Sequence, residues 1–264
     1  MPKIIVIGEA LVEVMRPDKS TPLDQPGNFE GPFASGAPAI FAVAAARLGL
    51  PVGFIGSVGD DSFGDLLQQR LEAEQVDRSY VQVVPGYTTG IAFIAYTADG
   101  SREFVFHLRH SAAAQLATER LDAADFADVA WLHISGSTLF LSEACRQACA
   151  AALRYTKDAG GKLSLDPNLR PELMPVDQAR QVLAPYLETA DLLLPYRNRK
   201  ETEQGHLRQL EKGDGIFDQN KHYAHGHRDR NDSGNEQRSL DNCLANSRFL
   251  LQTFFNLSCC LTLI

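Results

Sequence analysis

An acid, an amide and a guanidinium group occur within the short segment 166–170, Asp-Pro-Asn-Leu-Arg. The segment follows a run at 162–165 that is typical of a buried strand. Proline stiffens the backbone of such a loop, so the side chains of Asp166, Asn168 and Arg170 should project in fixed directions. Arg170 could pair with a transferred phosphate or with an acidic sugar. The alternative is that Asp166 and Asn168 only satisfy the hydrogen bonds of a turn.

Three further residues could contact an oxygen-rich ligand. Glu13 ends the segment 8–13 (GEALVE), and its carboxylate could accept hydrogen bonds from sugar hydroxyls or could simply be a solvated loop acid. Gly36 opens an Ala-rich helix whose free N–H groups can meet such a ligand, although Ser and Gly are also ordinary caps at helix starts. Arg109 follows another apolar strand and could clamp a carboxylate or phosphate with its forked donors; otherwise it is a surface arginine.

Composition argues against several other classes of function. The 264-residue chain has a net charge of −8, whereas nucleic-acid binding needs clustered Lys and Arg. No apolar run approaches the roughly 20 residues of a transmembrane helix, and the N-terminus lacks a secretory signal pattern. We therefore expect a cytoplasmic protein with no nucleic-acid or membrane partner. The five cysteines show no paired spacing, which favours reduced thiols over disulfides or a zinc site.

Strands and helices alternate along the first 195 residues. Strands are predicted at 4–7, 52–55, 89–96, 102–108, 129–134, 162–165 and 191–194, and helices at 37–48, 65–74, 142–158 and 175–188, the last bent at Pro185. This alternation predicts a parallel sheet covered on both faces. The Asp99-Gly100 pair predicts a hairpin, so a small antiparallel element should project from the sheet. Ligands of such sheets bind beyond the carboxyl ends of the strands, where segments 8–13 and 166–170 fall.

The composition changes abruptly near residue 195. All 13 prolines lie at or before Pro195, and no valine follows it. The stretch 212–242 is polar and lacks periodicity, which predicts a segment that cannot bury enough apolar surface to fold. We interpret residues 1–195 as a folded unit and 196–264 as foreign in character, either out-of-frame translation or a disordered tail with a terminal interaction motif. Three tail histidines, at 222, 225 and 227, lack the surroundings that hold a metal, so no metal site is predicted.

Five segments in this order resemble the ribokinase (PfkB) family of carbohydrate kinases: 8–13, 35–49 (SGAPAIFAVAAARLG), 55–64 (IGSVGDDSFG), 166–170 and 190–195 (ADLLLP). The resemblance implies a doubly wound, mostly parallel α/β sheet with a small antiparallel β lid that closes over a sugar. In this chain the fold would be truncated on its C-terminal side.

The same resemblance implies phosphoryl transfer from ATP, with Mg²⁺, to a hydroxyl of a sugar or sugar acid. Segments 102–111, 135–137 and 166–170 look most similar to 2-keto-3-deoxygluconate kinases, with fructokinases close behind. The residues that would bind the sugar are Glu13, Gly36, Arg109, Asn168 and Arg170. A homodimer formed through the lid would also fit the family.

The chain departs from the family in the part that performs the chemistry. It has no Gly-Ala-Gly-Asp motif, whose aspartate would be the general base, so no catalytic residue is assigned. Ser35 replaces a customary glycine and Ile40 a customary asparagine. We therefore expect a kinase by descent that is inactive as this chain and doubtful in binding ATP and Mg²⁺. The alternatives are a non-catalytic sugar-binding remnant and a nucleoside kinase of the same family, for which Phe104 and Phe106 could stack on a base. The first strand is not followed by the Gly-x-Gly-x-x-Gly of a dinucleotide-binding oxidoreductase.

Overall fold

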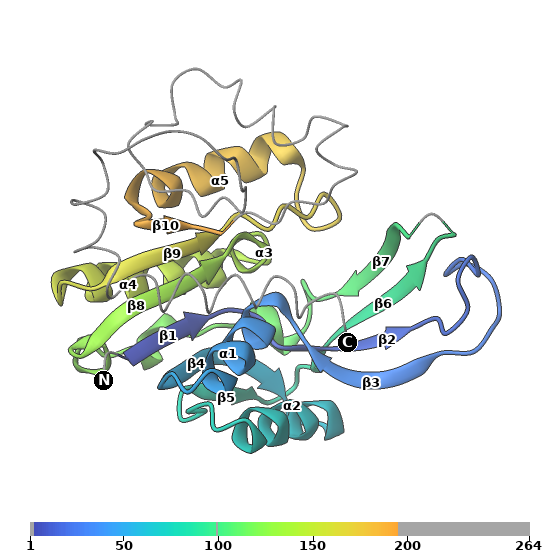
Figure 1. Ribbon diagram of the computed structural model, residues 1–264, viewed down its shortest axis with the longest axis horizontal. Coiled ribbons are helices and arrows are strands. Elements are labelled where there is room, and N and C mark those ends of the chain that lie inside the picture. Colours follow the sequence, from blue (N-terminus) through green and yellow to red (C-terminus); the bar gives the residue numbers. More distant parts are fainter. Residues whose placement is uncertain (1–2, 99, 195–264) are drawn as a thin grey trace, which may run out of the picture.

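Two β-sheets of different size make up the protein (Figure 1), of which the computed structural model describes residues 3–98 and 100–194. The larger sheet contains β1 (Lys3–Ile7), β4 (Val52–Gly59), β5 (Val81–Val84), β8 (Val129–Ser135), β9 (Lys162–Asp166) and β10 (Leu192–Leu193). These strands are all parallel, in the order β10-β9-β8-β1-β4-β5. The predicted parallel α/β sheet is therefore confirmed. Every prediction for 196–264 lies outside the described residues.

Helices cover both faces of the large sheet. They are α1 (Ala37–Arg47), α2 (Ser62–Ala73), α3 (Gly136–Leu139), α4 (Glu143–Asp158) and α5 (Val176–Thr189), with 3₁₀ turns η1 (Ala112–Ala114), η2 (Thr118–Arg120) and η3 (Ala123–Phe126). Successive side chains of a strand point to opposite faces. Accordingly, Ile4 and Val6 pack in the apolar cluster of α1 and α2, whereas Ile5 and Ile7 pack in that of α4 and α5. Burial on both faces explains why β1 is apolar throughout.

The smaller sheet, here called the lid, projects from one edge of the core (Figure 1). It contains β2 (Leu11–Met15), β3 (Glu30–Ser35), β6 (Gly90–Tyr96) and β7 (Arg102–His107), in the order β3-β2-β6-β7. The hairpin β6–β7 is antiparallel as predicted, although Asp99 of its turn lies outside the described residues. The lid as a whole is a mixed sheet, because β2 and β6 are parallel. The reason is that β2 continues outward from β1, and β6 continues outward from β5, which is parallel to β1.

The sequence failed to indicate three strands. Strand β2 begins at Leu11, so Glu13 lies in a strand and not in a loop. Strand β3 contains Gly31 and Pro32, which normally disfavour strands, and it lies at the edge of the lid where proline is tolerated. Strand β5 is only four residues long.

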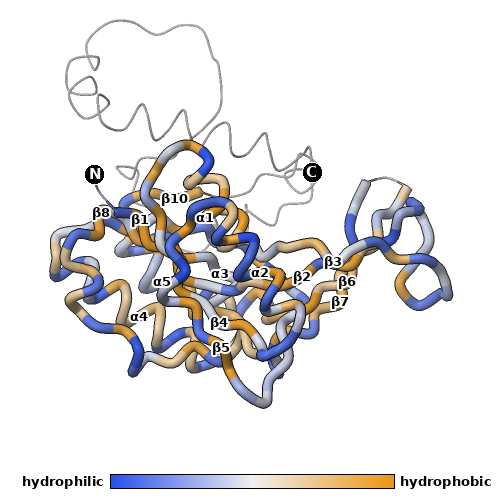
Figure 2. Tube along the Cα trace, turned by 90° about the horizontal axis from the view of Figure 1, so that it is seen from below, coloured by the Kyte–Doolittle hydropathy of each residue, from blue (hydrophilic) through white to orange (hydrophobic). Residues whose placement is uncertain are grey.

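The strands and the loops at the lid tip differ in hydropathy (Figure 2). Hydrophobic colour runs along the strands and gives way to hydrophilic colour in the loops at the lid tip. Among the described residues, every helix is too short or too polar to span a bilayer.

Candidate functional site

Polar side chains gather where β1, β8 and β9 end, at the edge of the core from which the lid projects. These three strands are neighbours in the sheet, so the segments that follow them are brought together although they lie far apart in the chain. The group comprises Glu9 after β1, Ser135, Ser137 and Thr138 at the end of β8, and Asp166, Asn168 and Arg170 at the end of β9. This is the position at which open α/β sheets bind ligands.

A buried carboxylate lies at the centre of this group. Glu9 is only 3% exposed. Its Oε1 accepts a hydrogen bond from Ser137 Oγ at 2.6 Å, and its Oε2 accepts one from Thr138 Oγ1 at 2.6 Å. Distances this short are typical of hydroxyl donors to an ionised carboxylate. The carboxylate thus joins the end of β1 to the turn that follows β8.

The hydrogen bonds continue from β8 to β9. The Ser135 and Ser137 hydroxyls are 2.9 Å apart, and Asn168 Nδ2 donates to Ser135 Oγ at 3.1 Å. Asn168 adopts a left-handed backbone conformation with φ 33°, which Asn tolerates better than most residues. Its backbone N–H donates to Asp166 Oδ1 at 3.0 Å. Asp166 therefore makes a hydrogen bond within the turn, which is the structural role considered above as an alternative to ligand binding.

Two carboxyl groups and one guanidinium group determine the local charge. Burial, the largest influence, raises the pKa of Glu9 above its ordinary value, and the hydrogen bonds from Ser137 and Thr138 oppose that rise. Burial likewise raises the pKa of Asp166, to about 7. The positive charge of Arg170 opposes both rises in pKa, because it favours the ionised forms of the two carboxyl groups.

Three glycines allow the backbone segments of the site to approach closely. A Cβ on Gly136 would lie 2.0 Å from the Pro167 carbonyl oxygen, and one on Gly8 would lie 2.5 Å from Thr138 Oγ1. Gly36 has φ 105°, and a Cβ there would lie 2.5 Å from the Glu9 carbonyl oxygen. Gly36 is the residue before α1. The structure therefore gives Gly36 a packing role against the backbone of Glu9.

The lid contributes a second set of side chains. The strand register places Glu13 opposite Ala92, and Ala92 opposite Phe106; Phe104 lies two residues from Phe106 on the same face. The Arg170 guanidinium lies 5.5 Å from the centroid of the Phe104 ring, within the range of a cation–π contact. Glu13 therefore lies on the lid face that meets Arg170.

Arg109 follows β7 and is exposed. Within the described part of the chain, neither Glu13 nor Arg109 has a side-chain hydrogen bond or ion pair. Of the five predicted site residues, Asn168 is connected to Glu9 through hydrogen bonds, and Arg170 acts on Glu9 through its charge. Glu13 faces these two residues from the lid. Gly36 packs behind Glu9, and Arg109 remains at the lid edge.

The carboxylate of Asp61 connects the base of the lid to the core by hydrogen bonds. Asp61 Oδ1 caps α2 by accepting from Phe63 N at 3.1 Å and Gly64 N at 2.9 Å, and it accepts from Thr89 Oγ1 at 2.7 Å. Its Oδ2 accepts from Thr89 N at 2.7 Å, directly before β6. Burial alone would raise the pKa of Asp61, but these hydrogen bonds together lower it below its ordinary value.

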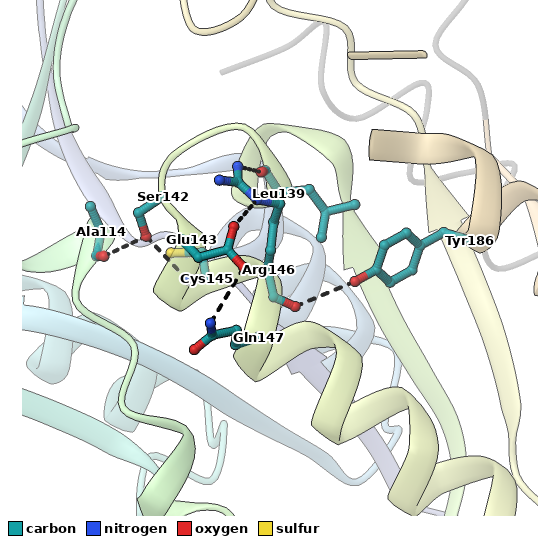
Figure 3. A network of polar contacts seen from close by, with 8 residues as sticks. All are labelled: Ala114, Leu139, Ser142, Glu143, Cys145, Arg146, Gln147 and Tyr186. Carbon is teal, nitrogen blue, oxygen red and sulfur yellow. Dashed lines mark hydrogen bonds and ion pairs between the residues drawn. The ribbon is translucent and has the colours of Figure 1, made fainter. Parts of the chain in front are cut away.

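Behind the site, a polar network holds the short helix α3 in place (Figure 3). Arg146 of α4 donates from Nη1 to the Leu139 carbonyl at 3.0 Å and from Nε to Glu143 at 2.8 Å. Tyr186 of α5 donates to the Arg146 carbonyl at 3.4 Å, and Ser142 Oγ donates to the Ala114 carbonyl at 2.7 Å. The turn that carries Ser137 and Thr138 is therefore supported by both α4 and α5.

Sequence reasoning missed Glu9 and the hydroxyl residues Ser135, Ser137 and Thr138, which lie where β8 ends and α3 begins. Glu9 was visible as the first of two carboxylates after the first strand, and the Ser-Gly-Ser segment 135–137 was visible at the end of another. The missing information was that the two segments are neighbours, since the order of strands in a sheet cannot be read from the chain.

The acidic side chains of the described residues do not gather into a group of three or more potential metal ligands. Between residues 3 and 194, Asp99 aside, no three His, Cys, Asp or Glu side chains lie close enough together to hold a metal ion. Glu9 and Asp166 are the acidic groups of the site: hydroxyl groups donate to both oxygens of Glu9, and the Asn168 backbone N–H donates to Oδ1 of Asp166.

Comparisons with known proteins agree with the fold. The model of the pfkB family carbohydrate kinases matches residues 1–211. A fructokinase of Klebsiella pneumoniae is 39% identical over 171 residues, covering 65% of this chain and 52% of its own length. Fructokinase-1 of Zea mays is 35% identical over 192 residues, covering 72% and 58%. The crystal structure of an E. coli protein described as a ribokinase II, in complex with ATP and Mg²⁺, superposes with a TM-score of 0.68 at 36% identity, covering 79% of this chain and 70% of that one.

The chain spans about half the length of the curated relatives it matches. The matching portion includes β1 to β10 and the lid, which together hold the site described above. The chain therefore belongs to the pfkB family of carbohydrate kinases.

Proposed function

We propose that residues 1–195 form the sugar-binding half of an ATP-dependent carbohydrate kinase site, and that this chain alone does not transfer phosphate. The observation that carries the proposal is the contact between Arg170 and Phe104. It places a cation from the core opposite the lid, with the Glu9 and Asp166 carboxyl groups behind it. A polar ligand bound between the two sheets would meet fixed donors and acceptors on one side and the lid on the other.

In this proposal the sugar contacts five residues. Asn168 and Arg170 meet it from the core, where hydrogen bonds and charge hold them. Glu13 accepts from hydroxyl groups on the lid side, and Arg109 closes over the ligand from the end of β7. Gly36 contributes its backbone at the start of α1, where the absence of a side chain permits close approach.

The absence of turnover follows from the lack of a general base. The sequence contains no Gly-Ala-Gly-Asp motif, whose aspartate would act as the general base on the sugar hydroxyl. Loss of a general base costs on the order of 10²–10⁴ in rate. Loss of nucleotide positioning as well removes the main source of phosphoryl-transfer catalysis.

Fructose and 2-keto-3-deoxygluconate are the two candidate sugars. Several curated relatives are named fructokinases, which supports fructose as the first ligand to test. The sugar acid is supported by the two arginines, Arg109 and Arg170, because forked guanidinium donors suit a carboxylate.

Two measurements on the full chain test the two parts of the proposal: calorimetry for sugar binding, and an ADP-release assay for phosphate transfer. We expect heat of binding with fructose or with 2-keto-3-deoxygluconate, and no sugar-dependent ADP release with Mg²⁺-ATP. Binding of neither sugar would refute the sugar site, and clear sugar-dependent ADP release would refute the claim of inactivity.

A matched pair of arginine variants locates the binding. Arg170→Ala removes the proposed ligand contact, whereas Arg180→Ala removes a half-buried arginine of α5 that pairs with Asp177. We expect at least tenfold weaker binding in the first variant and unchanged affinity in the second. Equal affinities would place the sugar elsewhere.

We also propose that two copies associate through their lids. Phe29 and Val105 of the lid region are 40% and 42% exposed, and both lie beside Phe93, so large apolar side chains are exposed together on the lid face that is opposite to the face of Glu13. Sedimentation analysis of the full chain should show a dimer, and a monomer at all concentrations would refute the association.

A further inference from the structure

Glu9 is the most deeply buried acidic residue of the site, yet its carboxylate is enclosed by protein hydroxyls. We propose that Glu9 is a positioning residue that sets the direction of a hydrogen-bond relay, so that Asn168 presents its carbonyl oxygen to the ligand. The proposal rests on the proposed sugar site, because it assigns the orientation of one of that site's ligand contacts.

The relay begins at the carboxylate, which can only accept hydrogen bonds when ionised. Ser137 Oγ and Thr138 Oγ1 each lie 2.6 Å from a different oxygen of Glu9. Each hydroxyl has a single proton, so both protons are committed to Glu9. Two anchored oxygens also prevent rotation of the carboxylate.

The direction of the remaining bonds follows from that commitment. Since the Ser137 proton points at Glu9, the 2.9 Å contact between Ser135 and Ser137 must use the proton of Ser135. Ser135 Oγ can then only accept from Asn168 at 3.1 Å. The group of Asn168 that approaches Ser135 must be the amide nitrogen, which leaves Oδ1 for the ligand.

The backbone holds both ends of this relay in place. A Cβ on Gly36 would lie 2.5 Å from the Glu9 carbonyl oxygen, so the segment around Glu9 is tightly packed against the start of α1. At the other end, Asp166 Oδ1 accepts from the Asn168 backbone N–H at 3.0 Å. The side chains therefore have little freedom to rearrange while Glu9 remains an acceptor.

The consequence is a preference in ligand chemistry. An outward carbonyl oxygen on Asn168 favours a ligand group that donates a hydrogen bond, such as a sugar hydroxyl. With a donor at position 9, the serine protons can reverse, and Asn168 can turn its amide nitrogen outward. Glu9→Gln is the smallest change that permits this reversal, since glutamine has almost the same shape and one NH₂ group.

A double-mutant cycle tests whether Glu9 acts through Asn168. Fructose and 2-keto-3-deoxygluconate are titrated into the full-length wild type, Glu9→Gln, Asn168→Ala and the double variant. Glu72→Gln, at an exposed glutamate of α2 that pairs with Arg78, is the matched control. We expect Glu9→Gln to weaken binding about tenfold in the wild-type background and less than twofold when Asn168 is already alanine. Equal effects in both backgrounds would overturn the relay.

A second measurement needs no ligand and separates this inference from the proposed function. The side-chain amide NMR signals of Asn168, identified by their loss in Asn168→Ala, should shift in Glu9→Gln and in Ser137→Ala but not in Glu72→Gln. Unchanged signals in folded Glu9→Gln would overturn the proposal. If the wild type binds neither sugar, the proposed function fails, while these signals still decide the role of Glu9.

Discussion

The two sides of the site differ in how much of their structure is already fixed. On the core side, Glu9 is buried, Asn168 is held by two hydrogen bonds, and Gly136 contacts the backbone of Pro167 closely. On the lid side, Glu13 is half-buried and Arg109 exposed, and neither has a polar partner among the residues described.

This difference indicates that the two sides have different roles in binding a ligand. Groups that are already hydrogen-bonded lose little conformational entropy when a ligand arrives, and they fix its orientation. Side chains on a projecting sheet can adjust to the ligand, at the cost of being ordered on binding. If the core side is the more tightly constrained, substitutions there should cost more stability than matched substitutions on the lid.

The largest expected effect comes from adding one methyl group to the core side. Gly136→Ala places a Cβ 2.0 Å from the Pro167 carbonyl oxygen, and two backbone segments cannot both give way. We expect a loss of about 3 kcal/mol or more in the free energy of unfolding, measured by urea denaturation with the fluorescence of Trp131, the single tryptophan.

Gly100 at the lid turn provides the matched control. Its Cβ would meet nothing within 4 Å, and only its φ of 83° opposes a side chain. We expect Gly100→Ala to cost about 1 kcal/mol. A cost as large as that of Gly136→Ala would mean that the lid is as constrained as the core.

A smaller loss is expected where Asp61 connects the lid to the core. Asp61→Ala removes the cap of α2 and both hydrogen bonds to Thr89, so we expect a loss of about 2 kcal/mol in the free energy of unfolding. Amide hydrogen exchange in β6 should increase as well, because the base of the lid is released. Asp60→Ala alters an exposed neighbour and should stay within about 0.5 kcal/mol; similar losses in the two variants would contradict this role.

The core was the easier region to predict from the sequence. Buried parallel strands such as β1 and β4 are short, apolar and bounded by glycine, and the helices between them show clear periodicity or capping residues. The predicted start of α2 was too late, at residue 65, because Asp61 caps it earlier with a side chain that also serves Thr89.

The lid and the centre of the site were harder to predict. Strand β3 is exposed along most of its length and contains Gly31 and Pro32, so neither hydrophobic periodicity nor propensity marks it. Segment 166–170 was found because its three polar groups lie close together in the chain. Glu9 and Ser137 were missed because their contact joins residues 128 positions apart, and nothing local in either segment indicates the other.

The pH dependence of stability should also distinguish the core side. The pKa of Asp166 is about 7 in the folded protein, against an ordinary value of 3.8. Between these values the folded protein holds a proton that the unfolded chain has released, so the stability attributable to this group falls as pH rises from about 4 to 7. Asp166→Asn removes this dependence. We therefore expect the free energy of unfolding of the variant to rise relative to that of wild type as the pH increases from 4 to 8.

Urea denaturation at the two pH values measures this difference. Asp177→Asn on α5 is the control, because its side chain is 91% exposed and the same substitution there should show no such change. A difference between Asp166→Asn and wild type that stays constant with pH would contradict the raised pKa.

The smallest expected effect lies on the lid. Val105 is 42% exposed on β7, opposite Phe93, which in turn contacts Phe29 edge to face. In a single copy of the chain, Val105→Thr leaves its hydroxyl in water and should change the free energy of unfolding by less than about 0.5 kcal/mol. Burial of the same face in a dimer would instead force that hydroxyl out of water, at a cost of about 1–3 kcal/mol. Denaturation at micromolar and at tenfold higher concentration separates the cases: a loss that grows with concentration means that a second copy covers the lid, and a small, constant loss means that the lid is free.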